Sequence, residues 1–207
     1  MRNTKESILE AQFTPGAGNW CTWMFGRDLV NWNNNFTWAK WVTPSRDLIS
    51  TFKQEGDEVR FKESVVYYDC GWSNYYPSDN YPFMYKCRSA NSSIIKYRYA
   101  DVLLLKAEAL IMQDTPDLEG AADIIDEVRD RAKLGALSSS TRSNKDALLN
   151  ALLKERRLEL AFEGQRWFDL VRLDKVEEVM NAVHAKDSGR KAQVYTYDKN
   201  SYRLPIP

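Results

Sequence analysis

The stretch "ERRLELAFEGQRWFDLVR", residues Glu155–Arg172, decides the fold of this chain. It contains four carboxylates and four arginines within eighteen residues. They alternate with leucines and aromatic residues that are typical of a helix core. Such a segment is a catalytic site, a binding surface or a structural ion-pair network.

Helical periodicity turns some of these charges toward the core. The predicted helix begins after Asn144, and its residues are spaced at about 100° around the axis. On this spacing Arg156 and Glu163 lie on the same face as several leucines. That face comprises Leu149, Leu152, Leu153, Arg156, Leu160, Glu163 and Trp167. Glu155, Glu159 and Glu163 recur at every fourth position, and such a column of like charges is unfavourable unless it is countered.

The arginines of the same segment are the natural counter-ions, because the planar guanidinium can pair a carboxylate with two hydrogen bonds. Buried ions need partners, and the charges here nearly balance. We therefore interpret the segment as a salt-bridge network that locks the last two helices together. Its expected members are Glu155, Arg156, Arg157, Glu159, Glu163, Arg166, Asp169 and Arg172.

Three functional interpretations compete with this structural one. Paired carboxylates serve as acid and base in glycosidases, and a row of arginines can bind an anion. A di-iron bundle site needs Glu-x-x-His on two helices, but His184 is the one histidine and lies in no such motif. The single histidine also argues against Ser-His-Asp and Cys-His catalysis. We expect no enzyme activity, no metal and no cofactor.

The chain from residue 95 onward reads as helices. Helices are predicted over Arg98–Gln113, from Pro116 to Lys133 after a Thr115 cap, from Asn144 to Phe162, and onward to Val183. They form two antiparallel pairs, each about the length of a tetratricopeptide repeat. The predicted fold class is therefore mainly α, with tetratricopeptide-like helix pairs.

The first 95 residues differ in composition. They hold six of the seven tryptophans and many Asn, Gly, Pro and Ser residues, so we predict loops and short strands. Strands are expected at Ser7–Thr14 and Glu63–Tyr68, and one helix at Thr43–Gln54 with Thr43 or Ser45 as its cap and Pro44 in its first turn. The expected organisation is an irregular aromatic-rich region (1–95), a helical region (96–184) and a tail (185–207), all within one domain.

The overall composition excludes some classes of protein. The 207 residues carry 29 basic and 29 acidic side chains, whereas nucleic-acid-binding domains usually have a basic excess. No apolar run reaches the length of a membrane span. The cysteines Cys21, Cys70 and Cys87 lack the spacing of a zinc site, which leaves reduced thiols or a Cys70–Cys87 disulfide.

Several motifs in order resemble the C-terminal part of the SusD/RagB family. They are "RYADVLLLKAEAL", "GAADIIDEVRDRAKL" and "LLKERRLELAFEGQRWFDLVR", followed by "YRLPIP" at the end of the chain. The segment "TPSRDLISTFKQEGDEVR" is similar to a further motif of that family, through Pro44, Asp47, Leu48, Phe52, Asp57 and Arg60. The resemblance covers about residues 40–207.

The resemblance implies an outer-membrane nutrient-binding lipoprotein at the cell surface. Such proteins bind oligosaccharides or polysaccharides on an irregular region that packs on a tetratricopeptide-like scaffold. They act in nutrient uptake with a TonB-dependent, SusC-like transporter, and they are not enzymes. A membrane contact would be made only through a lipid anchor, which is absent from this chain. The helix pairs alone suggest an alternative, a module that recognises a protein or peptide.

The aromatic-rich region supplies the residue types that sugars require. Sugars present flat C–H faces to aromatic rings and hydroxyl groups to polar side chains. Two segments, "NWCTWMFGRDLVNWNNNFTWAKW" and "CGWSNYYPSDNY", combine both. The candidate glycan-binding residues are Trp20, Trp23, Trp32, Trp38, Trp72, Tyr75, Tyr76, Asn33 and Asn74. The alternative is that many of these rings form the core of a region poor in leucine.

Trp32 and Trp72 are the first residues to test, because asparagine and serine flank them. We expect Trp32→Ala or Trp72→Ala to abolish polysaccharide binding with little change in melting temperature, since an exposed ring supports no core. Isothermal titration and thermal unfolding measure the two quantities. A large fall in melting temperature would show that the ring is part of the core.

Overall fold

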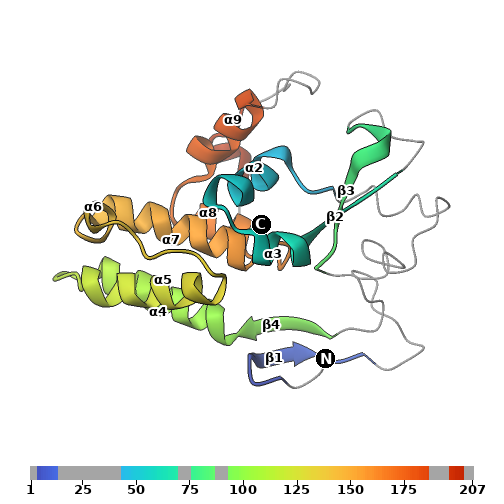
Figure 1. The fold of residues 1–207 in the computed structure, drawn as a ribbon. Coiled ribbons are helices and arrows are strands. Elements are labelled where there is room, and N and C mark those ends of the chain that lie inside the picture. Colours follow the sequence, from blue (N-terminus) through green and yellow to red (C-terminus); the bar gives the residue numbers. More distant parts are fainter. Residues whose placement is uncertain (1–3, 14–42, 70–75, 87–92, 187–195, 203–207) are drawn as a thin grey trace.

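The computed structural model describes residues 4–13, 43–69, 76–86, 93–186 and 196–202, and the ribbon in Figure 1 follows them. The fold is mainly helical with short strands, as the sequence predicts. Two helix layers lie on the left of Figure 1, and two small sheets lie below and to the right of them.

The first helix pair consists of α4 (Tyr99–Met112) and α5 (Leu118–Arg131). They run side by side beneath α7 (Lys145–Glu159), and the three helices enclose one apolar core. Alanines keep these helices close, because their small side chains let the backbones approach. The buried members are Leu104, Ala107, Ile111, Ala121, Ala122, Ile125, Val128, Leu148 and Leu152.

Side-chain caps fix where the helices begin. Asn144 caps α7 through a bond from the Ala147 amide (2.9 Å), and the helix begins directly after it, at the predicted start. The cap of α5 is Asp117, whose Oδ1 accepts from Gly120 N at 2.9 Å. The prediction of Thr115 as the cap is therefore wrong, because a carboxylate two residues later reaches the free amides of the first turn.

The helix α7 ends earlier than predicted. It stops at Glu159, and the backbone turns through Phe162 and Gly164, both with positive φ (66° and 83°). A left-handed residue closes a helix, so the predicted continuation to Phe162 is wrong. One consequence is that Trp167, placed on the core face by a continuous helix, is 39% exposed.

The last predicted helix is two helices. α8 (Arg166–Arg172) ends at a turn in which Asp174 has a φ of 55°, and α9 (Val176–Lys186) follows. Lys175 N closes this turn on the carbonyl of Leu170 at 2.8 Å. Two further helices are short, with four residues each. α6 (Ser139–Arg142) lies in the predicted polar linker, and α10 (Lys199–Tyr202) lies in the tail.

The N-terminal region contributes helices as well as strands. α2 (Arg46–Glu55) begins after Ser45, whose Oγ accepts from Leu48 N at 3.1 Å, so Pro44 precedes the cap rather than occupying the first turn. α3 (Glu58–Ser64) was not predicted and replaces the expected start of a strand at Glu63. Asp57 caps α3 by accepting from Arg60 N at 3.1 Å.

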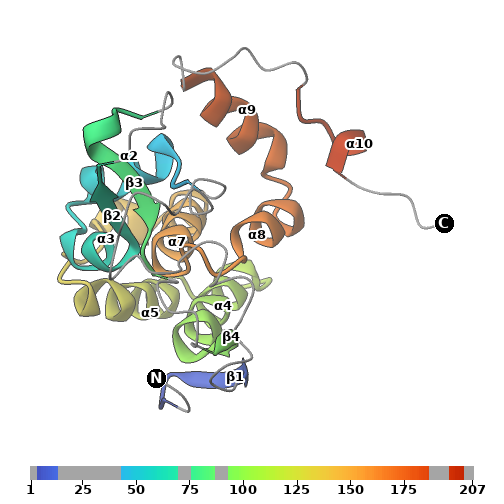
Figure 2. The same cartoon turned by 90° about the vertical axis from the view of Figure 1, so that its right-hand side faces the viewer.

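The strands form two antiparallel pairs. β1 (Ser7–Ala11) pairs with β4 (Ile94–Arg98), and β2 (Val65–Tyr68) pairs with β3 (Tyr81–Met84) after the 3₁₀ turn η3 (Ser78–Asn80). Figure 2 shows β2 and β3 beside α2 and α3 on the left, whereas β1 lies with β4 at the bottom of the view. None of the helices in the described ranges combines the length and apolar character needed to cross a membrane.

Helices from the N-terminal region pack directly on the central helix. Leu48 and Phe52 of α2 form a core cluster with Leu158 of α7 and with Ala161 just beyond it. The helix α7 therefore lies between α2 on one side and the α4–α5 pair on the other (Figures 1 and 2). Its position makes α7 a central element of the described part of the chain.

Candidate functional site

The carboxylates of α7 and the following turn are paired with cations from distant elements. Glu155 Oε1 lies 2.6 Å from Arg60 Nη1, Glu159 Oε1 lies 2.6 Å from Arg98 Nη1, and Glu163 Oε2 lies 2.7 Å from Arg98 Nε. Arg60 comes from α3 and Arg98 from the end of β4. The expectation that the arginines of the same segment pair these carboxylates is therefore wrong.

The segment's own arginines face other neighbours. Arg156 bridges Asp101 of α4 and Asp169 of α8, at 2.8 Å and 2.9 Å. Arg157 pairs with Asp47 of α2 at 2.6 Å. Successive residues of a helix point about 100° apart, so neighbours in the sequence contact different elements. These two arginines thus join α7 to three other helices, α4, α8 and α2.

Two further arginines behave differently from each other. Arg172 pairs with Asp169 at 2.8 Å and with Glu108 of α4. Arg166 donates to the carbonyl of Leu153 at 3.2 Å and has no carboxylate within ion-pair distance among the described residues. Burial and the nearby Arg157 lower the pKa of Arg166 to about 10. The expected ion pair of Arg166 is therefore not found.

The central carboxylates differ in their proton affinity. Burial acts to raise the pKa of Glu159, but Arg98 and Arg131 outweigh it and lower this pKa to about 2. Burial raises the pKa of Glu155, which Arg60 and Arg129 counter only in part. Sequence reasoning missed Arg98, Arg129 and Arg131 as members of this network. Arg60 was noted only as part of a motif.

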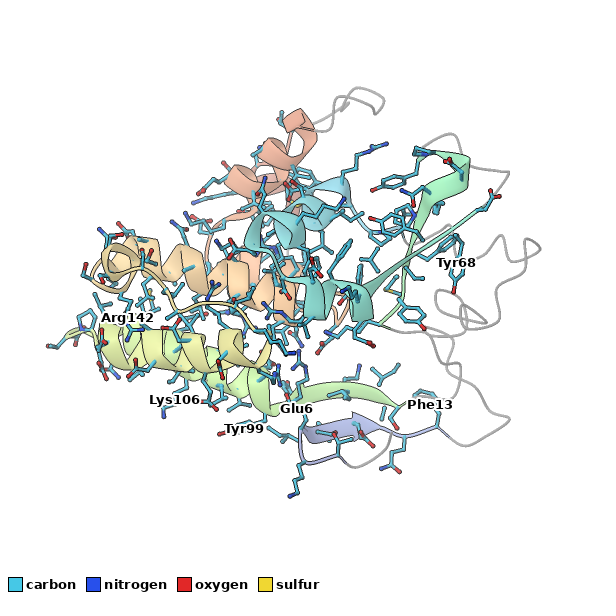
Figure 3. All side chains as sticks on the ribbon, viewed as in Figure 1. Glu6, Phe13, Tyr68, Tyr99, Lys106 and Arg142 are labelled. Atoms are coloured by element: carbon cyan, nitrogen blue, oxygen red, sulfur yellow. The ribbon has the colours of Figure 1, made fainter. Side chains whose placement is uncertain are left out.

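A cavity of about 730 Å³ adjoins this network. Arg60, Arg98, Glu159 and Glu163 line it together with Glu6 of the N-terminal region. Glu6 accepts from the Ala100 amide at 3.1 Å, and Figure 3 places it beside the junction of β4 and α4. Most of these charges pair with one another, which leaves few of them for a ligand.

One of the nine candidate sugar-contacting residues, Tyr76, lies in the described part of the chain. The others, Trp20, Trp23, Trp32, Trp38, Trp72, Tyr75, Asn33 and Asn74, lie outside the described residues. The same is true of Cys21, Cys70 and Cys87. Tyr76 is therefore the candidate whose surroundings the structure describes.

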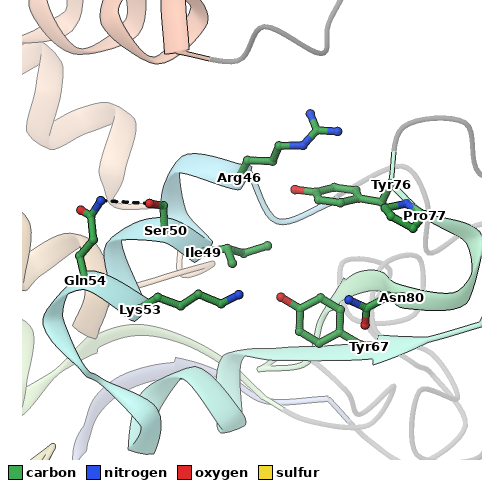
Figure 4. A pocket seen from close by; sticks show the side chains of 9 residues that line it. All are labelled: Arg46, Ile49, Ser50, Lys53, Gln54, Tyr67, Tyr76, Pro77 and Asn80. Atoms are coloured by element: carbon green, nitrogen blue, oxygen red, sulfur yellow. Dashed lines mark hydrogen bonds between the residues drawn. The ribbon is translucent and has the colours of Figure 1, made fainter.

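Tyr76 lines a pocket of about 490 Å³ between α2 and the β2–η3 region (Figure 4). Its hydroxyl donates to the carbonyl of Pro44 at 2.8 Å, and its ring meets Tyr81 edge to face with centroids 5.6 Å apart. The guanidinium carbon of Arg46 lies 4.6 Å from the ring centroid. These contacts hold the Tyr76 ring in one orientation at the pocket wall.

Tyr67 of β2 forms another wall of the pocket (Figure 4). Its ring packs against Phe61 of α3, with centroids 6.4 Å apart. Burial raises the pKa of Tyr67, so its hydroxyl stays protonated at neutral pH and can donate a hydrogen bond. Sequence reasoning missed Tyr67, because it lies in a run of alternating residues that indicates only a strand.

One face of α2 completes the pocket. Arg46, Ile49, Ser50 and Lys53 are spaced at i, i+3, i+4 and i+7, so they share that face. Gln54 also lines the pocket, and its amide donates to Ser50 Oγ at 3.2 Å (Figure 4). The pocket therefore combines two aromatic rings with amide, hydroxyl and cationic groups.

A model of the SusD family matches residues 84–207. The chain belongs to the SusD family. SusD-like protein P38 of Formosa agariphila is 41% identical over 106 residues, which are 48% of this chain and 21% of that protein. SusD-like protein P2 of the same organism is 35% identical over 125 residues, or 58% of this chain and 24% of that protein. The chain therefore spans about a quarter of these relatives or less.

Solved structures share the fold of this SusD-family chain. Surface glycan-binding protein A from Bacteroides thetaiotaomicron has a TM-score of 0.68 at 18% identity, and the match covers 100% of this chain and 49% of that one. A laminarin-binding SusD-like protein has a TM-score of 0.63 at 24% identity, with 93% and 46% covered. These similarities show the fold of the described region.

We predict that Arg156→Ala destabilises the protein by about 3–5 kcal/mol, because it removes the cation that pairs with the buried carboxylate of Asp101 and one of the two that pair with Asp169. Urea unfolding followed by circular dichroism measures the change. Lys62→Ala is the control, since its pair with Glu58 is largely exposed and should contribute less than about 1 kcal/mol. Equal losses in the two variants would contradict a structural role for Arg156.

The pKa of Glu159 predicts a pH dependence of stability. A carboxylate whose pKa is lower in the folded state stabilises the protein above its unfolded pKa, and this stabilisation is lost as the pH falls from about 5 to about 2. The shift corresponds to about 3 kcal/mol. Glu155 has a raised pKa and offsets part of this loss at low pH.

We therefore expect the free energies of unfolding of the wild type and Glu159→Gln to differ most at pH 7 and to converge toward pH 3. Urea unfolding at a series of pH values measures this, and Glu58→Gln in the exposed pair with Lys62 is the control. A difference that stays constant with pH would refute the prediction.

Proposed function

We propose that the intact protein containing this chain binds oligosaccharides at the cell surface, with the Tyr67–Tyr76 pocket as a contact site. The observation that carries this proposal is that two tyrosine rings flank one open pocket beside hydrogen-bonding side chains. Its volume of about 490 Å³ falls in the range of small-ligand sites.

The chemistry of the pocket suits a sugar. An aromatic ring offers an apolar face to the C–H side of a pyranose, and polar groups at its edge exchange hydrogen bonds with the hydroxyls. Ser50, Gln54 and Asn80 supply such groups around the two tyrosines. The rings are held by protein contacts, which lowers the entropy lost on binding.

The similar structures support a glycan over a peptide as the ligand. One is described as a surface glycan-binding protein and another as laminarin-binding. We further propose that binding occurs without turnover and serves nutrient uptake. A TonB-dependent, SusC-like transporter in the outer membrane would be the partner, and a lipid anchor in the full-length protein would hold it at the cell surface. Family membership is what supports these steps.

We expect Tyr76→Ala in the intact protein to weaken binding to its polysaccharide at least about tenfold, or about 1.4 kcal/mol. Tyr76→Phe loses the hydrogen bond to the Pro44 carbonyl but keeps the aromatic ring, and because the ring contacts the sugar it should retain most of the affinity. Affinity electrophoresis against a polysaccharide panel that includes laminarin, followed by isothermal titration, measures both.

Tyr99→Ala is a matched control, because Tyr99 is 51% exposed on the outer side of α4, away from the pocket (Figure 3). It should bind like the wild type. Two outcomes would count against the proposal: a folded Tyr76→Ala variant with unchanged affinity, or an intact protein that binds peptides and no polysaccharide.

A further inference from the structure

The described lining of the Tyr67–Tyr76 pocket is positively charged. Arg46 and Lys53 both line it, whereas no aspartate or glutamate does so among the described residues. Two cations beside two aromatic rings favour a ligand with negative charge, because an anion gains Coulomb energy at a partly desolvated site.

This charge arises from the way α2 sorts its ionisable side chains. Asp47 pairs with Arg157 of α7 at 2.6 Å, and Glu55 pairs with Lys154 of α7 and with Arg129 of α5. Both carboxylates are therefore directed to the scaffold helices and neutralised there. The opposite side of the helix carries Arg46 and Lys53, which line the pocket.

The spacing of these residues accounts for the sorting. Arg46 and Lys53 are seven residues apart, nearly two full turns, and therefore share the pocket face. Asp47 and Glu55 are eight residues apart and share the face toward α7. A change that shifted this helix by one residue would turn it by about 100° and move both sets of charges away from their present neighbours.

Each cation is suited to an anionic group. Arg46 stacks over the Tyr76 ring, which orients its planar fork for bidentate contact with a carboxylate or sulfate. Lys53 is exposed and makes no ion pair with any described residue, so its three donors can turn toward a ligand. Figure 4 shows Lys53 extending from α2 toward Tyr67.

We propose that the glycan bound in this pocket is anionic, with carboxylate or sulfate groups held by Arg46 and Lys53 while its sugar rings contact Tyr67 and Tyr76. This inference rests on the proposed glycan-binding function of the pocket and adds the class of sugar. Uronic acids and sulfate esters both supply such a negative group. The experiment therefore tests carboxylated and sulfated polymers separately.

The test compares matched polymers on the intact protein. One arm uses a polyuronate and its carboxyl-reduced neutral form, and the other uses a sulfated galactan and its desulfated form. We expect the anionic member of one pair to bind at least about tenfold more tightly than its neutral partner. We also expect that affinity to fall when sodium chloride rises from about 50 to about 300 mM.

Variants assign the effect to the pocket. Lys53→Gln and Arg46→Gln should each reduce the affinity for the anionic polymer several-fold. Lys53→Arg keeps the positive charge and should retain most of the wild-type affinity. Lys106→Gln is the matched control, because Lys106 is an exposed lysine on the outer side of α4 (Figure 3). The Lys106→Gln variant should bind the polymer like the wild type. Unchanged affinity in Lys53→Gln and Arg46→Gln would overturn the inference.

The outcomes separate this inference from the proposed function. If neutral polymers bind as tightly as anionic ones and Tyr76→Ala weakens both, the pocket binds glycans but does not select negative charge. If no polysaccharide binds, both proposals fail. Selective binding of an anionic polymer that is lost in Lys53→Gln supports both.

Discussion

The need of buried carboxylates for cations organises this fold. Glu155 and Glu159 are buried on one face of α7, and neither can stay ionised there without partners. Two of their cations come from α3 and β4. Arg60 and Glu155 are 95 residues apart in the sequence, and Arg98 and Glu159 are 61 residues apart. Forming the pairs therefore requires the tertiary structure, and the pairs in turn fix which elements surround α7.

The same arrangement positions the proposed ligand site. α2 is attached to α7 by Leu48 and Phe52 in the core and by the Asp47–Arg157 pair at its edge. These contacts set the rotation of α2 about its own axis. Because the rotation is set, Arg46 and Lys53 are directed to the pocket, where Tyr67 and Tyr76 meet them from the other side.

Local and long-range features differ in how well the sequence predicts them. The spacing of Leu104, Ala107 and Ile111 predicts the buried face of α4, and Ser45 predicts the start of α2, because both depend on nearby residues. Ion-pair partners do not follow a local rule. Arg156 and Arg172 pair with Asp169 of the same segment, whereas Glu155, Glu159 and Glu163 take their cations from distant elements.

The pocket shows the same division. Tyr76 was a candidate because of its aromatic and polar surroundings, whereas Arg46 and Lys53 were not among the candidates. A signal for them was present in the i and i+7 spacing of cations on a helix whose acidic residues lie on another face. Recognising it requires knowing which face packs on α7, and that information comes from the assembled structure.

The two-sided character of α2 has a consequence for how specificity can change. The side toward α7 carries the core contacts and the paired carboxylates, so substitutions there alter stability. The side toward the pocket carries Arg46, Ser50 and Lys53, which support no core cluster among the described residues. If the proposed site binds a glycan, exchanging these three positions would alter its ligand preference on an unchanged scaffold.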